Sequence, residues 1–165
     1  MITDAAAHSS SDALPPRPVP AASAVLMRNG CVLLVQRAQA PNRGYWSFPG
    51  GKIRAGETVR QAVLRELGEE TGVSASAGSI LTVLDVMAHR GDRLDYHYLL
   101  VVIYCEWLSG VPRAADDAAD ARWIPIERLR RGDYLLTDTV LPVLDLAQQH
   151  ANSNPHPDAS CHTPP

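Results

Sequence analysis

The chain has 165 residues, of which 45% are hydrophobic and 20% are charged, and its formal net charge is −3. This length and apolar fraction suit one globular domain with a single core. The slight negative charge excludes a general attraction to nucleic acid or to an anionic membrane, so neither is expected as a partner. The three cysteines have neither a zinc-ligand spacing nor a disulfide framework, which indicates a reduced, cytoplasmic protein.

The two ends of the chain differ in composition from the middle. Residues 1–20 are rich in Ala, Ser and Pro, and residues 151–165 offer almost nothing apolar to bury. Both segments are expected to be disordered, which leaves residues 21–150 as the folded domain. The N-terminus lacks the basic start and continuous apolar core of a secretory signal.

Two apolar runs open the domain. Residues 22–28 and 31–37 flank Asn29-Gly30, a dipeptide typical of a two-residue β-hairpin. An irregular loop then leads into an extended segment at residues 46–53.

A helix is expected after this extended segment. Thr58 can cap its first turn while Gln61, three residues later, reaches back to the cap, and Gly72 supplies a left-handed stop. At about 100° per residue, one stripe of the helix is apolar and contains Val59, Ala62, Val63 and Leu67.

Carboxylates interrupt the apolar stripe. Glu66 and Glu70 project within it, one turn apart, and Glu69 lies at its edge. Burying unpaired carboxylates is costly and like charges four residues apart repel, so a cation must occupy the site. Because a single arginine, Arg65, is too little for three glutamates, we expect a hard divalent cation with oxygen ligands, such as Mg²⁺.

The second half of the domain is expected to contain two long strands, at 80–89 and 94–107, joined by a tight turn. The stretch 96–104 is apolar on both faces, which predicts a central strand covered on both sides. Four elements complete the domain: an aspartate-rich loop at 112–121, a short strand at 122–125, a helical turn at 126–131 and an amphipathic helix at 137–150. Mixed strands with helices on both faces predict an α/β fold, an α/β/α sandwich with a mixed central sheet.

The segment GKIRAGETVRQAVLRELGEETGV resembles the signature of the Nudix hydrolase family. Every fixed position of that signature is filled, by Gly51, Glu57, Arg65, Glu66, Leu67, Glu69, Glu70, Gly72 and Val73. The resemblance covers about residues 22–149 and implies the Nudix fold, which is the same sandwich. It also implies hydrolysis of a nucleoside diphosphate linked to another group, with Mg²⁺ or Mn²⁺ as cofactor.

The resemblance implies metal ligands on the helix and just before it. These would be the carboxylates of Glu66, Glu69 and Glu70 and the carbonyl of Gly50, where paired glycines let the backbone approach closely.

Further residues would act in catalysis. The resemblance implies that Arg65 orients Glu57. Both residues would hold the metal ligands in position without binding the ion themselves. Glu66 is the first candidate for the general base. The alternative is Asp117, which stands a few residues before Trp123, although the aspartate cluster around it could equally be an exposed turn.

Three residues before the helix are candidate substrate contacts. Arg37 and Arg43 could contact phosphate, and Trp46 could stack on a base or form part of the core. His97, within a covered strand, is expected to be a hydrogen-bonded structural residue.

The general resemblance is to short bacterial ADP-ribose pyrophosphatases and MutT-type enzymes. The first hypothesis for the substrate is ADP-ribose or a similar nucleotide sugar. The alternatives are a MutT-type nucleoside triphosphate pyrophosphohydrolase and, in another class, a nucleotide-sensing module that does not hydrolyse. A small-molecule nucleotide is the expected partner in each case, and a homodimer is one alternative for the oligomeric state.

Overall fold

Two β-sheets frame the molecule in the computed structural model, which describes residues 17–40, 42–116 and 118–154. The strands of the first sheet are, in spatial order, β5 (Gly50–Lys52), β1 (Val19–Val25), β7 (Arg93–Ser109) and β6 (Ser74–Arg90). The second sheet contains β2 (Met27–Arg28), β3 (Cys31–Arg37) and β4 (Trp46–Ser47), and β8 (Ala118–Pro125) pairs with β3. β1 runs parallel to β7 and antiparallel to β5, so the first sheet is mixed.

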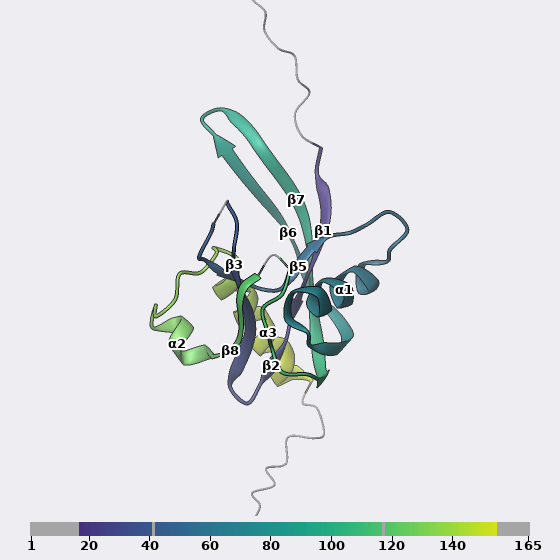
Figure 1. Cartoon of the computed structure of the whole chain (residues 1–165), viewed down its shortest axis with the longest axis vertical. Helices are drawn as coiled ribbons and strands as arrows, with labels where there is room; N and C mark the ends of the chain where they lie inside the picture. Colours follow the sequence, from purple (N-terminus) through teal and green to yellow (C-terminus); the bar gives the residue numbers. More distant parts are fainter. Residues whose placement is uncertain (1–16, 41, 117, 155–165) are drawn as a thin grey trace, which may run out of the picture.

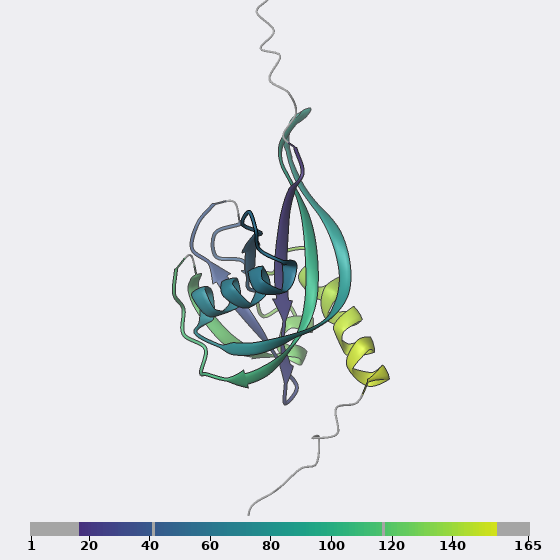
Figure 2. The same cartoon turned by 90° about the vertical axis from the view of Figure 1, so that its right-hand side faces the viewer.

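Helices cover both faces of the first sheet. Figure 2 shows α1 (Val59–Thr71) on one side and α3 (Val140–Ser153, yellow) on the other. The short α2 (Ile126–Arg130) follows β8 directly (Figure 1). This arrangement confirms the predicted α/β/α sandwich with a mixed sheet. Within the described residues, no helix has the length and apolar character needed to cross a lipid bilayer.

The core divides into two clusters because successive strand residues point to opposite faces. Val102 of β7 packs in the cluster that contains Leu144 of α3. Its neighbour Ile103 packs in the cluster that contains Val63 and Leu67 of α1. The first sheet therefore holds α1 in place through apolar contacts on one face, which fixes where the polar face of this helix lies.

The Asn29-Gly30 hairpin is confirmed. Both residues have positive φ, 49° and 72°, as the expected two-residue turn requires, and β2 pairs antiparallel with β3 around them.

Several boundaries differ from those predicted. β1 begins at Val19, two residues before the predicted domain start, and α3 runs from Val140 to Ser153 instead of 137–150. β8 begins at Ala118 rather than at residue 122, because its pairing with β3 continues as far as Arg37. The aspartate-rich segment is thus partly strand.

The prediction that β7 is central is confirmed, but its coverage is only partial. Val102 and Ile103 are buried, whereas Leu99 is 42% exposed. Figure 1 shows the reason, since the β6–β7 hairpin extends well beyond the helices that cover the rest of the sheet.

Candidate active site

The start and end of α1 fix the orientation of its charged face. Thr58 Oγ1 accepts a hydrogen bond from the Gln61 backbone N–H at 3.2 Å, and the Gln61 side chain accepts one from the Thr58 N–H at 2.8 Å. Gly72 ends the helix with φ of 68°. The predicted capping box and left-handed stop are both confirmed, and such a cap is worth ~1 kcal/mol.

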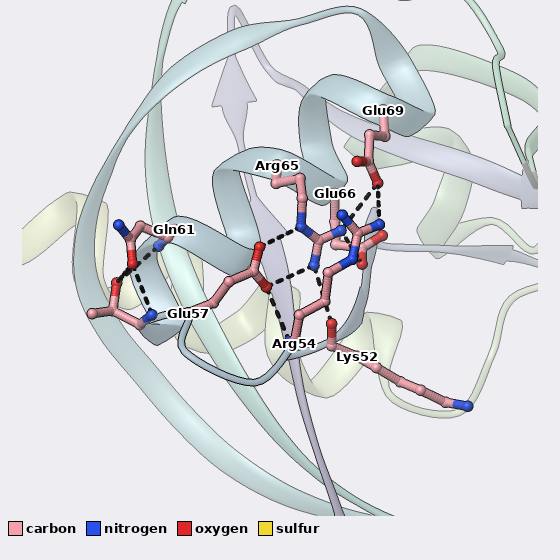
Figure 3. A network of polar contacts seen from close by, with 8 residues as sticks. Lys52, Arg54, Glu57, Gln61, Arg65, Glu66 and Glu69 are labelled. Carbon is pink, nitrogen blue, oxygen red and sulfur yellow. Dashed lines mark hydrogen bonds and ion pairs between the residues drawn. The ribbon is translucent and has the colours of Figure 1, made fainter.

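Arg65 lies at the centre of the charged face, as Figure 3 shows. Its Nε and Nη2 donate to the two carboxylate oxygens of Glu57 at 2.6 and 2.9 Å. Its Nη1 donates to Glu66 at 2.6 Å and to Glu69 at 3.0 Å. A further bond joins Nη2 to the Lys52 carbonyl at 3.1 Å and ties the helix to β5.

Arg65 is too little for Glu66, Glu69 and Glu70, as expected, because it pairs with only the first two of them. Arg65 contacts three carboxylates at once, because its planar guanidinium presents donors in several directions. These hydrogen bonds raise the pKa of Arg65, with Glu57 contributing most. Of the three glutamates considered, only Glu70 has no contact with Arg65.

Glu70 is instead held by the backbone. The Gly50 N–H donates to its Oε2 at 2.9 Å. Burial raises the pKa of the Glu70 carboxyl to about 7, the charges of Glu66 and Asp116 add to the rise, and the Gly50 bond and the charge of Arg37 oppose it. A cation beside Glu70 would relieve the cost of ionising this carboxyl.

The glycine pair before the helix allows this close approach. A Cβ on Gly51 would lie 2.6 Å from the Glu66 carboxylate, and a Cβ on Gly50 would lie 2.3 Å from the Ala22 carbonyl oxygen. A side chain at Gly50 would clash with β1, and one at Gly51 would displace the Glu66 carboxylate.

The residues present fit a hard divalent ion in their chemistry. Glu66, Glu69 and Glu70 offer carboxylate oxygens, the donors that Mg²⁺ prefers. Among the described residues, no three His, Cys, Asp or Glu side chains already converge as a metal site. Glu66 and Glu69 are directed to Arg65 instead, so these side chains would have to turn in order to share one ion. The Gly50 carbonyl stays a predicted ligand.

A cavity of about 790 Å³ opens beside the acids. Glu66, Glu69, Glu70 and both glycines line one end of it, together with Arg37 from the end of β3. The acids and Arg37 therefore line one cavity, and the charge of Arg37 acts on Glu70.

The other two predicted substrate contacts lie elsewhere. Arg43 is exposed and does not line the cavity. Trp46 is only 6% exposed and packs edge-on against Tyr134, with ring centroids 5.6 Å apart. Trp46 is thus a core side chain, the second of the two roles expected for it, and Tyr134 from the segment before α3 packs against its ring.

Sequence reasoning missed the other end of the cavity. Tyr96 and Tyr98 line it, with ring centroids 5.3 Å apart, and Met87 lines it from β6. The Lys52 Nζ lies 6.0 Å from the Tyr98 ring centroid. Alternation along β7 could have indicated that the two tyrosines share a face.

The aspartates of the predicted cluster lie in different surroundings. Asp116 has φ of 50° and lines the cavity. Asp120 lies in β8, forms an ion pair with Arg122 and accepts the Ala121 N–H at 2.8 Å. Asp117 lies outside the described residues.

Two other polar residues have structural roles. The His97 Nε2 lies 2.6 Å from the Asp85 carboxylate on the neighbouring strand, which confirms the expected hydrogen-bonded histidine. Burial raises the pKa of the Cys105 thiol to about 12, so this cysteine stays protonated.

Comparison with known proteins agrees with this geometry. The family model for the NUDIX domain matches residues 17–143. An ADP-ribose pyrophosphatase from Methanocaldococcus jannaschii is 32% identical over 68% of this chain, which spans 64% of that protein. A putative 8-oxo-dGTP diphosphatase 2 from Mycobacterium tuberculosis is 35% identical over 62% of this chain and 78% of its own length.

A solved structure gives the same result. The crystal structure of a MutT NUDIX hydrolase from Burkholderia pseudomallei has a TM-score of 0.67 and 29% identity, covering 79% of this chain and 98% of that one. From the matching family model, the shared fold and the complete glutamate–arginine signature on α1, we conclude that this chain belongs to the Nudix family.

Proposed function

We propose that this protein is a pyrophosphohydrolase that cleaves the phosphoanhydride of a nucleoside diphosphate linked to another group. The observation that carries this proposal is that Glu66, Glu69 and Glu70 of α1 line one cavity of about 790 Å³. Arg65 holds two of them, together with Glu57, in a network of ion pairs beside it. That volume is ample for a nucleotide. ADP-ribose or a similar nucleotide sugar is the proposed substrate, supported by the name of the archaeal relative.

Nudix hydrolases generally use divalent metal ions, and we propose Mg²⁺ or Mn²⁺ here. Glu66, Glu69 and Glu70, with the Gly50 carbonyl, would hold it. When bound, such an ion neutralises phosphate charge and makes bound water a stronger acid.

The protein's own residues would then position the reacting groups. Glu57 fixes the Arg65 guanidinium through two hydrogen bonds, and Arg65 in turn restrains Glu66 and Glu69. Arg37, at the cavity wall near Glu70, would contact a phosphate oxygen. Glu66, which lies against Gly51, is the proposed acceptor of the proton from the attacking water, with Asp117 as the alternative.

A second candidate is hydrolysis of nucleoside triphosphates to monophosphate and pyrophosphate. The mycobacterial relative, a putative 8-oxo-dGTP diphosphatase, favours it. The two candidates share the acids and differ in the group that fills the rest of the cavity.

A substrate panel tests both candidates. The purified protein is incubated in magnesium with ADP-ribose, other nucleotide sugars and nucleoside triphosphates, and the products are separated. AMP plus ribose phosphate supports the first candidate, and a nucleoside monophosphate plus pyrophosphate supports the second. If tight binding of nucleotide occurs without any product, the non-hydrolytic sensor replaces both.

We also propose a cytoplasmic location. The thiols of Cys31 and Cys105 are free in the described part of the chain, which suits a reducing compartment. Whether two copies associate is tested by light scattering.

A further inference from the structure

Ser23 of β1 is a buried polar residue that the proposed mechanism does not use. It is 4% exposed, and its Oγ has no hydrogen-bond partner among the described residues. Buried hydroxyls are normally paired, because an unpaired one has lost its bonds to water without replacement. An unpaired group of this kind points to a ligand.

The position of Ser23 shows where that ligand would lie. Ser23 stands directly opposite Gly50 in the β1–β5 pairing and opposite Val102 in the β1–β7 pairing. Its Cβ lies 2.7 Å from the point that a Cβ on Gly50 would occupy, so only glycine leaves space there. Ser23 lines the cavity, in the same cross-strand row as the glycine whose N–H holds Glu70.

The surroundings of Ser23 within the protein offer its hydroxyl little else. Its neighbours along β1 are Ala22 and Ala24, and Val102 stands beside it on β7. Arg37 lines the same cavity. A hydroxyl on an apolar strand, in a cavity that a guanidinium also lines, suits an anionic oxygen that accepts a hydrogen bond from it.

We propose that the Ser23 hydroxyl donates a hydrogen bond to a phosphate oxygen of the nucleotide bound in this cavity. The proposal rests on the proposed function, in that it takes the acid end of the cavity as the phosphate end. Ser23 would be a substrate-binding residue, placed by the backbone of β1 beside Gly50.

The test measures the binding of methylene-bridged ADP, which cannot be hydrolysed, by calorimetry in magnesium. Ser23→Ala is expected to weaken this binding about tenfold, the loss typical of one hydrogen bond to a charged group. The melting temperature of the free Ser23→Ala protein is expected to equal or exceed that of the wild type, because the variant no longer buries an unpaired hydroxyl.

A matched double variant tests whether the position of the hydroxyl on β1 matters, and not only its presence. Ala21 lies on the same face of β1, two residues and ~6.6 Å away, and also lines the cavity. The double variant Ala21→Ser/Ser23→Ala has the composition of the wild type with its hydroxyl displaced, and it is expected to bind as weakly as Ser23→Ala.

Three outcomes would overturn the proposal. They are a change in affinity below about twofold in Ser23→Ala, a melting temperature lowered by several degrees, which indicates a structural partner for the hydroxyl, and full affinity in the double variant. Failure of the proposed function looks different: the wild type binds the analogue, and loses affinity on Ser23→Ala, yet releases no product from any nucleotide.

Discussion

Arg65 and Glu57 form a two-pronged ion pair across the turn that precedes α1. Nε and Nη2 of the arginine donate to separate carboxylate oxygens at 2.6 and 2.9 Å. The Arg65 hydrogen bond, followed by the Arg54 N–H, lowers the pKa of Glu57 to about 2. Because the folded-state pKa is lowered, the stabilisation from this pair is present above the ordinary glutamate pKa and is lost as the pH falls towards 2.

Replacing Arg65 by lysine tests the importance of the two parallel hydrogen bonds from its guanidinium to Glu57. Lysine keeps the charge but cannot contact Glu57 through two parallel bonds while also reaching Glu66 and Glu69. Arg65→Lys is expected to lower turnover of ADP-ribose by about ten- to a hundredfold, the usual cost of losing support behind a metal site. The control is Arg54→Lys, since Arg54 is exposed and contacts Glu69 at 3.4 Å. An equal loss of turnover in both variants would contradict a special role for the Arg65 guanidinium.

Glu70 should make stability without metal depend on pH. Its pKa is raised to about 7, so burial of Glu70 carries no ionisation penalty below the ordinary glutamate pKa, and the penalty grows as the pH rises to 7. The penalty is on the order of 3 kcal/mol, at ~1.36 kcal/mol per pKa unit. Glu70→Gln is therefore expected to be more stable than the wild type at about pH 8, but not at about pH 5.

Urea unfolding in a chelator at the two pH values measures this difference. The same variant is expected to lose hydrolysis by about a hundredfold or more, because a charge that stabilises the transition state is gone. A stability gain that is the same at both pH values, or near-wild-type turnover in saturating magnesium, would show that Glu70 does not have this role.

Local signals in the sequence were sufficient for part of the site. The Thr58–Gln61 cap and the Gly72 stop depend on residues a few positions apart, so α1 and the spacing of its glutamates could be predicted closely. The Asn29-Gly30 turn is local in the same sense.

What the sequence could not provide depends on contacts between distant segments. Trp46 is buried because Tyr134, far along the chain, packs against it. Tyr98 lines the cavity because β7 extends beyond the helices and pairs with β1. β8 begins early because β3 offers it backbone partners. Each of these results depends on tertiary pairing, which no nearby residue encodes.

The tyrosines at the far end of the cavity are expected to bind the base. Tyr98→Ala should raise the KM for ADP-ribose by about tenfold and change kcat less, since stacking on one aromatic ring is worth ~1–3 kcal/mol. Tyr45→Ala is the matched control, because Tyr45 is 37% exposed and does not line the cavity. An unchanged KM in Tyr98→Ala, or an equal rise in both variants, would mean that the base binds elsewhere.

The terminal segments are expected to be dispensable. By composition, residues 1–16 and 155–165 offer little apolar surface to repay the entropy of ordering. A chain cut to residues 17–154 retains all of β1 and α3. Its melting temperature and turnover are expected to match those of the full chain, and a large fall in either would show that a terminal segment contributes to the domain or to a partner subunit.

The aspartate series decides between the two candidates for the general base. We expect Asp117→Asn to lower turnover about a hundredfold or more, the lower end of the usual contribution of a general base, while magnesium binding to the free enzyme stays unchanged. Asp120→Asn should have little effect, because Asp120 is paired with Arg122 in β8 and lies away from the cavity. Asp116→Asn is the closer control, since Asp116 lines the cavity beside the acids.

Turnover and magnesium affinity are measured for all three aspartate variants under the same conditions. Mild and equal effects would identify a solvated turn and leave Glu66 as the base. A selective loss in Asp116→Asn would assign the downstream carboxylate to Asp116, because it already faces the cavity and its charge acts on Glu70.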